Sequence, residues 1–146
     1  MRLTILLLIL ISFITVHAQE PDQIVGVWLT QDSDSKIEIK LNSKGKYEGS
    51  IIWLKNPNED NGSPKIDDKN PDEALRTRSI LGLKILDNFE YDPDENNWSN
   101  GSIYDPKSGN TYKCYIWFEK DDLNTLFVKG YIGISIIGRT VNWKRL

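Results

Sequence analysis

Histidine and cysteine are almost absent from this chain, which has one of each in 146 residues. The histidine, His17, lies at the end of an apolar N-terminal run, so removal of that run would leave no imidazole. Ser-His-Asp and Cys-His catalysis and the common zinc sites need histidine, and we therefore expect none of them. Cys114 has no intrachain partner for a disulfide, and its apolar neighbours at alternate positions indicate a small buried hydrophobe.

The chain also lacks an excess of positive charge. Without Arg2 it keeps 18 − 1 = 17 basic residues against 21 acidic ones, a formal charge of 17 − 21 = −4. No basic stripe interleaved with aromatic residues is present, so we expect no nucleic acid partner.

Asp92 begins a stretch that resembles a calcium loop, but Asn97 and Ile103 stand where that loop needs glycine and an acid. We therefore predict no metal site and no cofactor.

Residues 1–18 predict a secretory signal peptide. They combine one positive charge, an apolar run and small residues at the end, with cleavage expected after Ala18. The run is too short to cross a bilayer with ease, and polar residues follow it. We therefore expect residues 19–146 to form one exported domain, periplasmic or secreted, with no membrane span in the mature chain.

A complete β-hairpin can be read between Gly101 and Trp117. Asp105–Gly109 supplies proline and glycine for the turn. After the turn the side chains alternate, and one face carries Tyr112, Cys114, Ile116 and Phe118. This period is typical of a strand with one buried side, so the hairpin indicates an antiparallel β protein.

About eight strands are expected in all, and every connection between them is short except one. Regular strand spacing fits a sandwich or a closed barrel, and we favour an all-β meander barrel because closure removes exposed edges. The expected strands cover residues 23–30, 35–41, 46–54, 82–91, 97–104, 111–119, 125–132 and 136–144.

The long connection over residues 55–81 concentrates polar side chains, among them Asp68 and Asp72. Asn70–Arg76 has the cap, proline and acid of a short helix. One interpretation is a lid over the barrel mouth, in which Arg76 and Arg78 hold an anionic head group. The other is that Asp67 and Asn70 cap the helix while both arginines pair with nearby acids.

Aromatic side chains give a second set of candidates. They could line a cavity or stack on a ligand, although such residues in β proteins more often pack in the core or across strands. In addition to Tyr47 and Trp117, the candidates for ligand binding are Asp67, Asn70, Arg76, Arg78, Trp53, Tyr104 and Tyr112.

An ordered set of short segments resembles the domain of unknown function 2147 family, small exported proteins with a lipocalin-like fold. The resemblance implies a barrel of about eight strands and no activity to inherit. In the wider lipocalin group, a Gly-x-Trp on the first strand tends to lie under an arginine of the last strand; here Trp28 would lie under Arg139 or Arg145. The segments are Gly26–Trp28, Gly49–Leu54, Asp67–Asp72, Arg76–Gly82, Gly101–Gly109, and Gly130–Gly133 with Gly138–Thr140 and Trp143.

Three functions remain open at this point. The first is a non-catalytic exported binding module that holds a small apolar or amphipathic ligand, with Arg76 and Arg78 near its head group. The second is a filled barrel that acts as an envelope accessory or protein-interaction protein. The third is a hydrolase that uses carboxylates only, for which Asp67 with Asp105 is the available pair.

Overall fold

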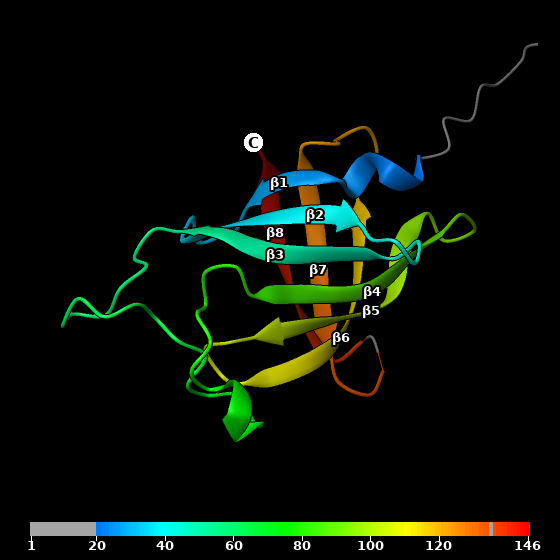
Figure 1. Ribbon diagram of the computed structural model, residues 1–146. Helices are drawn as coiled ribbons and strands as arrows, with labels where there is room; N and C mark the ends of the chain where they lie inside the picture. The colour runs from blue at the N-terminus through cyan, green and yellow to red at the C-terminus, as the bar shows by residue number, and fades with distance from the viewer. Residues whose placement is uncertain (1–19, 135) are drawn as a thin grey trace, which may run out of the picture.

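The computed structural model describes residues 20–134 and 136–146, and the expected signal peptide lies outside this part of the chain. Eight antiparallel strands follow one another around a closed barrel in the order β1 to β8 (Figure 1). The all-β meander barrel predicted from strand spacing is therefore confirmed. The strands are β1 Gly26–Leu29, β2 Ser35–Leu41, β3 Tyr47–Leu54, β4 Lys84–Asp92, β5 Asn97–Asp105, β6 Asn110–Phe118, β7 Thr125–Tyr131 and β8 Gly138–Arg145.

Both helical segments among the described residues are single 3-10 turns. The first, η1 Pro21–Ile24, replaces the beginning of the strand that we expected to start at residue 23. The second, η2 Glu73–Leu75, lies within the long connection. The helix expected at Asn70–Arg76 is shorter and starts later, because Asp72 rather than Asn70 is its N-cap and accepts a hydrogen bond from the Ala74 amide.

Bulges bend the strands around the barrel. Asn88 and Asn100 have φ angles of 65° and 58°, and each lies where its strand carries one residue more than its neighbour. Asparagine tolerates this left-handed conformation better than most residues. Next to the second bulge, Gly101 leaves room for the ring of Phe89, which a Cβ would overlap. These irregularities provide the curvature that closure requires.

A bulge in β3 also changes the direction of Trp53. We expected Trp53 to share one side with Tyr47 and Ile51, as strict alternation requires. The pairing shifts between Lys36 and Ile37, which leaves Ile52 as the extra residue on β3. Trp53 consequently faces outward, 37% exposed, with Lys36 Nζ 4.9 Å from its ring centroid.

The apolar core fills the end of the barrel covered by η1. Trp28 and Trp98 both pack against Phe118, and their ring centroids lie 5.8 and 5.6 Å, respectively, from the centroid of the Phe118 ring. Their indole N–H groups donate to backbone carbonyls of η1, at Ile24 and Pro21. The largest fully buried apolar side chains are Trp28, Trp98, Phe89, Ile24, Ile37, Ile39, Leu86, Ile116, Leu126 and Val128.

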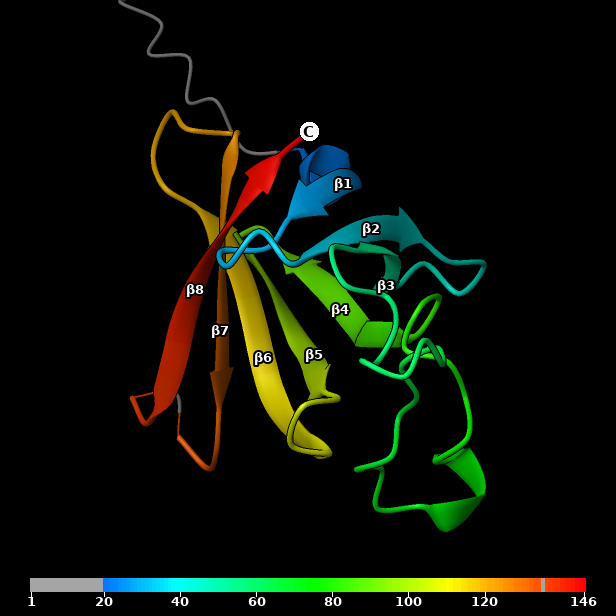
Figure 2. The same ribbon diagram turned by 90° about the vertical axis from the view of Figure 1, so that its left-hand side faces the viewer.

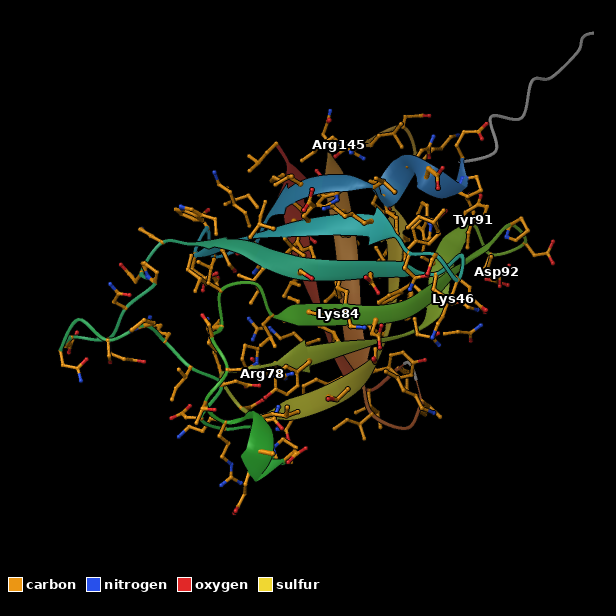
Figure 3. All side chains as sticks on the ribbon, viewed as in Figure 1. Lys46, Arg78, Lys84, Tyr91, Asp92 and Arg145 are labelled. Atoms are coloured by element: carbon orange, nitrogen blue, oxygen red, sulfur yellow. The ribbon has the colours of Figure 1, made fainter. Side chains whose placement is uncertain are left out.

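Arg145 closes this end of the barrel. Of the two arginines that the sequence left open, it is the one whose guanidinium lies over Trp28, with its carbon 4.2 Å from the ring centroid. The same guanidinium donates to the carbonyls of Leu123, Val25 and Gln23. Figure 3 shows Arg145 beside β1, well away from Arg78 on the connection between β3 and β4.

The opposite end carries the longer loops. Figure 2 shows η1 and the C-terminus at the top, while the β5–β6 turn, the β7–β8 hairpin and the long connection extend at the bottom. The two ends therefore differ: one is sealed by core residues, and the other is surrounded by loops.

We predict that Arg145→Ala lowers the free energy of unfolding by about 2 to 4 kcal/mol, because three charge-assisted hydrogen bonds and a cation–π contact are lost. Arg139→Ala is the matched control on the same strand, since Arg139 forms no ion pair in the described part of the chain. Denaturant unfolding of both variants measures the difference. Equal losses would contradict a closing role for Arg145.

We also predict that Cys114 is inert in the native protein. The thiol is 1% exposed, and burial raises its pKa. Reaction with an aromatic disulfide reagent at neutral pH should be at least about a hundredfold slower than in denaturant, since little thiolate forms and access is blocked. Rapid labelling of the native protein would show that this strand opens in solution.

Candidate functional site

The loop-bearing end opens into a cavity of about 800 Å³. This volume is within the range of sites that hold one small molecule. Tyr104 and Tyr112, both predicted as ligand-binding residues, are part of its wall. The remaining deep wall is apolar and consists of Ile51, Leu54, Ile80, Ile85, Ile103, Val128, Val141 and Trp143.

Charged loops surround the mouth of this cavity. Lys107 Nζ, in the β5–β6 turn, lies 2.9 Å from Asp34 Oδ2, in the loop between β1 and β2. Burial acts to raise the pKa of Asp34, but hydrogen bonds from Lys107, Thr30 and Ser35 outweigh it, so the pKa is lowered overall. The pair therefore links two loops at neutral pH, and the link weakens as acid protonates Asp34 below its ordinary pKa.

One side of the mouth offers polar groups with no internal partner. Arg139 lies on the same face of β8 as the buried Trp143, lines the cavity and forms no ion pair among the described residues. On β6, the hydroxyl of Tyr112 has no hydrogen-bond partner in the same part of the chain. Gly130 lies between them on β7 and pairs with Arg139. Because glycine has no side chain, Ile103 and Tyr112 pack closely against its backbone in this part of the wall.

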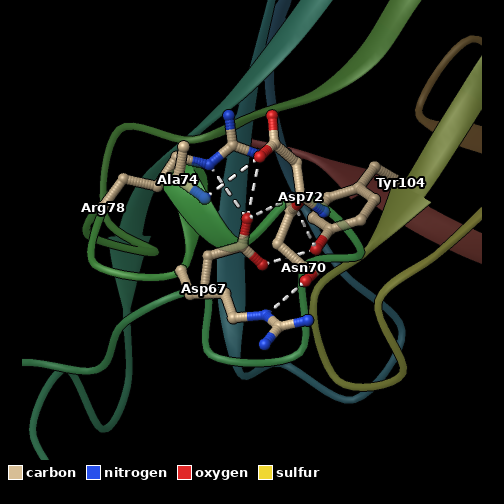
Figure 4. Close-up of polar contacts among 7 residues, drawn as sticks. Asp67, Asn70, Asp72, Ala74, Arg78 and Tyr104 are labelled. Atoms are coloured by element: carbon tan, nitrogen blue, oxygen red, sulfur yellow. Dashed lines mark hydrogen bonds and ion pairs between the residues drawn. The ribbon is translucent and has the colours of Figure 1, made fainter.

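Asp67 organises the base of the long connection. Its side chain is fully buried, and Arg78 approaches Oδ2 with Nη2 at 2.8 Å and Nε at 2.9 Å. Asn70 donates to the same oxygen at 2.8 Å, and the Tyr104 hydroxyl donates to Oδ1 at 2.5 Å. Figure 4 shows the four side chains converging. A buried carboxylate with this many donors is satisfied internally, so the cluster joins the connection to β5.

The two arginines proposed for a head group therefore have other partners. Arg78 is paired with Asp67, and Arg76 donates to the Asn70 carbonyl at 2.7 Å and pairs with Glu73 at 3.4 Å. Neither lines the large cavity. Arg78, Asn70 and Tyr104 instead border a smaller hollow of about 300 Å³. The interpretation in which both arginines pair with nearby acids describes these contacts, although Asp72 provides the cap.

The structure thus brings together only part of the predicted site. Tyr104 and Tyr112 lie in the cavity wall, Trp53 faces solvent, and Asp67 with Asn70 lies behind the wall. Arg139 and Gly130 were missed as site residues, since Arg139 was considered only for closure over Trp28. Alternation along the last two strands could have placed both on the inner face.

The two carboxylates considered for a hydrolase, Asp67 and Asp105, both accept hydrogen bonds from neighbouring groups. Asp67 has the partners described above, and Asp105 accepts hydrogen bonds from the Lys107 amide and the Ser108 hydroxyl. Within residues 20–134 and 136–146, no three side chains of His, Cys, Asp or Glu gather as a metal site. The same residues contain no helix with the length and apolar character needed to cross a membrane.

We predict that Asp67→Asn lowers the free energy of unfolding by about 2 to 4 kcal/mol, because Arg78 loses its partner and a buried hydrogen-bond network is broken. Asp68→Asn is the matched control. The carboxylate of Asp68 is 63% exposed and 4.0 Å from Lys69, so its loss should cost less than about 0.5 kcal/mol. Chemical denaturation of both variants provides the comparison, and a similar cost for the two would argue against the structural role of Asp67.

Comparison with known proteins agrees with this architecture. The structure of HP1028 from Helicobacter pylori, described as belonging to the lipocalin family, is 25% identical in sequence and superposes with a TM-score of 0.67, covering 84% of this chain and 82% of that one. A comparison with curated proteins found no match. The family described as "Uncharacterized protein conserved in bacteria (DUF2147)" matches residues 26–145. The chain therefore belongs to the DUF2147 family and has a lipocalin-like barrel.

Proposed function

We propose that this protein is an exported, non-catalytic binding protein that holds one small amphipathic molecule in its barrel. The observation that carries the proposal is the cavity of about 800 Å³, with an apolar interior and one open end. Burial of an apolar chain there would be favourable by roughly 25 cal/mol for each Å² removed from water. The N-terminal pattern of residues 1–18 supports work outside the cytoplasm.

The head group of the ligand would lie beside Arg139 and Tyr112. Both line the cavity, and both have polar groups with no partner among the described residues. An arginine next to a hydroxyl donor favours a carboxylate or another small anionic group. This assignment moves the head-group site from Arg76 and Arg78, which are engaged elsewhere, to the opposite side of the mouth.

The filled-barrel alternative predicts a different interior. A closed core leaves no space for a ligand, whereas this barrel has side chains packed at one end and a cavity at the other. The number of strands does not distinguish the two alternatives, since an eight-stranded barrel can either be filled by side chains or hold one small ligand. The cavity therefore favours the binding protein over the filled barrel.

We predict that a fluorescent long-chain fatty acid binds the wild-type protein and that Gly130→Val weakens binding at least about tenfold. A Cβ at residue 130 would already lie 3.2 Å from Ile103 Cγ2 and 3.4 Å from Tyr112 Cβ, so valine would displace these two cavity-lining side chains. Lys129→Val is the matched control, because it adds the same side chain on the outer face of β7. Fluorescence titration measures both affinities.

Arg139→Ala provides a test that does not depend on packing. It should weaken binding of the fatty acid by about tenfold but leave the corresponding long-chain alcohol unchanged, since only the carboxylate gains from the charge. Arg76→Ala should change neither. Absence of fatty-acid and alcohol binding to the wild-type protein, with a bare mass in native mass spectrometry after purification from the exported fraction, would refute the proposal.

A further inference from the structure

The hairpin that joins β7 to β8 presents a group of aliphatic side chains to solvent. Ile132, Ile134, Ile136 and Ile137, here called the β7–β8 tip, are 68%, 64%, 79% and 64% exposed. Single exposed apolar residues are ordinary, but several in one short segment indicate an interaction site. In Figure 2 the tip extends below the other strands at the loop-bearing end.

The backbone of the hairpin directs these side chains away from the core. The Ile132 amide donates to the Ile137 carbonyl at 3.3 Å, and the Ile137 amide donates to the Ile134 carbonyl at 3.1 Å. Gly138 packs closely against the carbonyl of Gly130 and the side chain of Tyr131, where a Cβ would not fit. The hairpin is thus closed by its own contacts, and its isoleucines remain largely exposed.

Charge is distributed unevenly around the tip. Residues 123–146 contain no aspartate or glutamate but two lysines and two arginines, in a chain with 21 acidic residues. In the strand register, Lys129 and Arg139 lie opposite residues of neighbouring strands near the tip, and Lys113 lies opposite Tyr131. None of the three forms an ion pair within the described residues. The tip is therefore flanked by free positive charge.

Tyrosine side chains complete this surface. Tyr131 and Tyr115 lie on the outer face of β7 and β6, with ring centroids 6.0 Å apart. Tyrosine combines an apolar ring with a polar hydroxyl and is favoured where one end of a side chain is dry and the other wet. A projecting aliphatic tip, unpaired cations and tyrosines together match the interface of a bilayer that carries anionic lipids.

We propose that the β7–β8 tip inserts into the interfacial region of an anionic bilayer and that Lys113 and Lys129 contact its head groups. The occupant is a lipid surface rather than a protein, because the tip projects rather than forming a hollow, and the strands beside it, β6 to β8, contain no aspartate or glutamate. The acidic side chains of this end, such as Asp34 and Asp105, lie on other segments. Ile132 and Ile137 also line the cavity, so insertion places the mouth at the lipid surface. The inference does not require a ligand in the barrel.

Flotation of the protein with vesicles tests this inference. Vesicles of phosphatidylcholine and phosphatidylglycerol in equal parts should retain the protein, and vesicles of phosphatidylcholine alone should retain much less. The double variant Ile134→Asp with Ile136→Asp should lower partitioning at least about tenfold. Leu41→Asp is the matched control, because Leu41 is 48% exposed on β2 at the sealed end and should partition as the wild type does.

Charge changes provide a second measurement. Lys113→Ala and Lys129→Ala should each lower partitioning into anionic vesicles by about fivefold, with little change for neutral ones. Both side chains face outward, so fatty-acid binding in solution should be unchanged. Loss of vesicle binding with retained fatty-acid binding separates this inference from the proposed function, and the reverse result would separate them as clearly.

A dye on the tip reports insertion directly. Since the thiol of Cys114 is buried, Ile134→Cys can be labelled with an environment-sensitive dye, and its emission should shift to the blue with anionic vesicles. The same dye on Leu41→Cys should not shift. The inference is overturned if wild-type protein ignores anionic vesicles, if Leu41→Asp loses as much as the tip variant, or if the tip instead drives self-association without lipid.

Discussion

Closure of the barrel between its first and last strands is the constraint on which the rest of the structure depends. The register pairs β1 with β8 at only two positions, Trp28 with Arg145 and Leu29 with Lys144, whereas β7 and β8 pair at seven. The guanidinium of Arg145 adds side-chain contacts to this short pairing of β1 with β8, here called the seam. It covers the indole of Trp28 and donates to carbonyls on both sides of the seam.

Sealing one end in this way determines where a ligand could enter. The aromatic cluster and η1 fill the barrel near Arg145, so the empty volume lies toward the other end, among the loops. The Asp67 cluster then acts as a support. By joining the long connection to Tyr104, it holds that connection beside the mouth, while Asp67 and Arg78 themselves do not line the cavity.

The apolar interior and the apolar tip lie at the same end. Ile132 and Ile137 belong to both, since they are exposed on the hairpin and also line the cavity. A molecule moving between a membrane and the barrel would meet the aliphatic side chains of the tip before it reached Arg139 and Tyr112. The charged loops opposite, including Asp34 and Lys107, leave the aliphatic side as the less polar path. Ligand binding and membrane contact would then be two uses of one opening.

Much of the fold could be predicted from the local pattern of turn residues and alternating apolar side chains. Turn residues such as Pro106 and Gly109, and the alternation from Tyr112 to Phe118, specify strands with one buried face, and eight such strands favour closure. Departures occur where an extra residue breaks the period. Ile52 is an ordinary strand residue, and only the pairing of β3 with β2 shows that it is the bulge that turns Trp53 outward.

The candidate site was harder to predict because it depends on long-range pairing. The sequence by itself determined the number and order of the strands, the buried cysteine and the polar character of the long connection, since these follow from residue type and period. Only the tertiary structure decided that Arg145 rather than Arg139 covers Trp28, that Arg78 is engaged by Asp67, and that Arg139 lines the mouth. The physical reason is that a partner for each charge is chosen by register and closure, which join residues far apart in the chain.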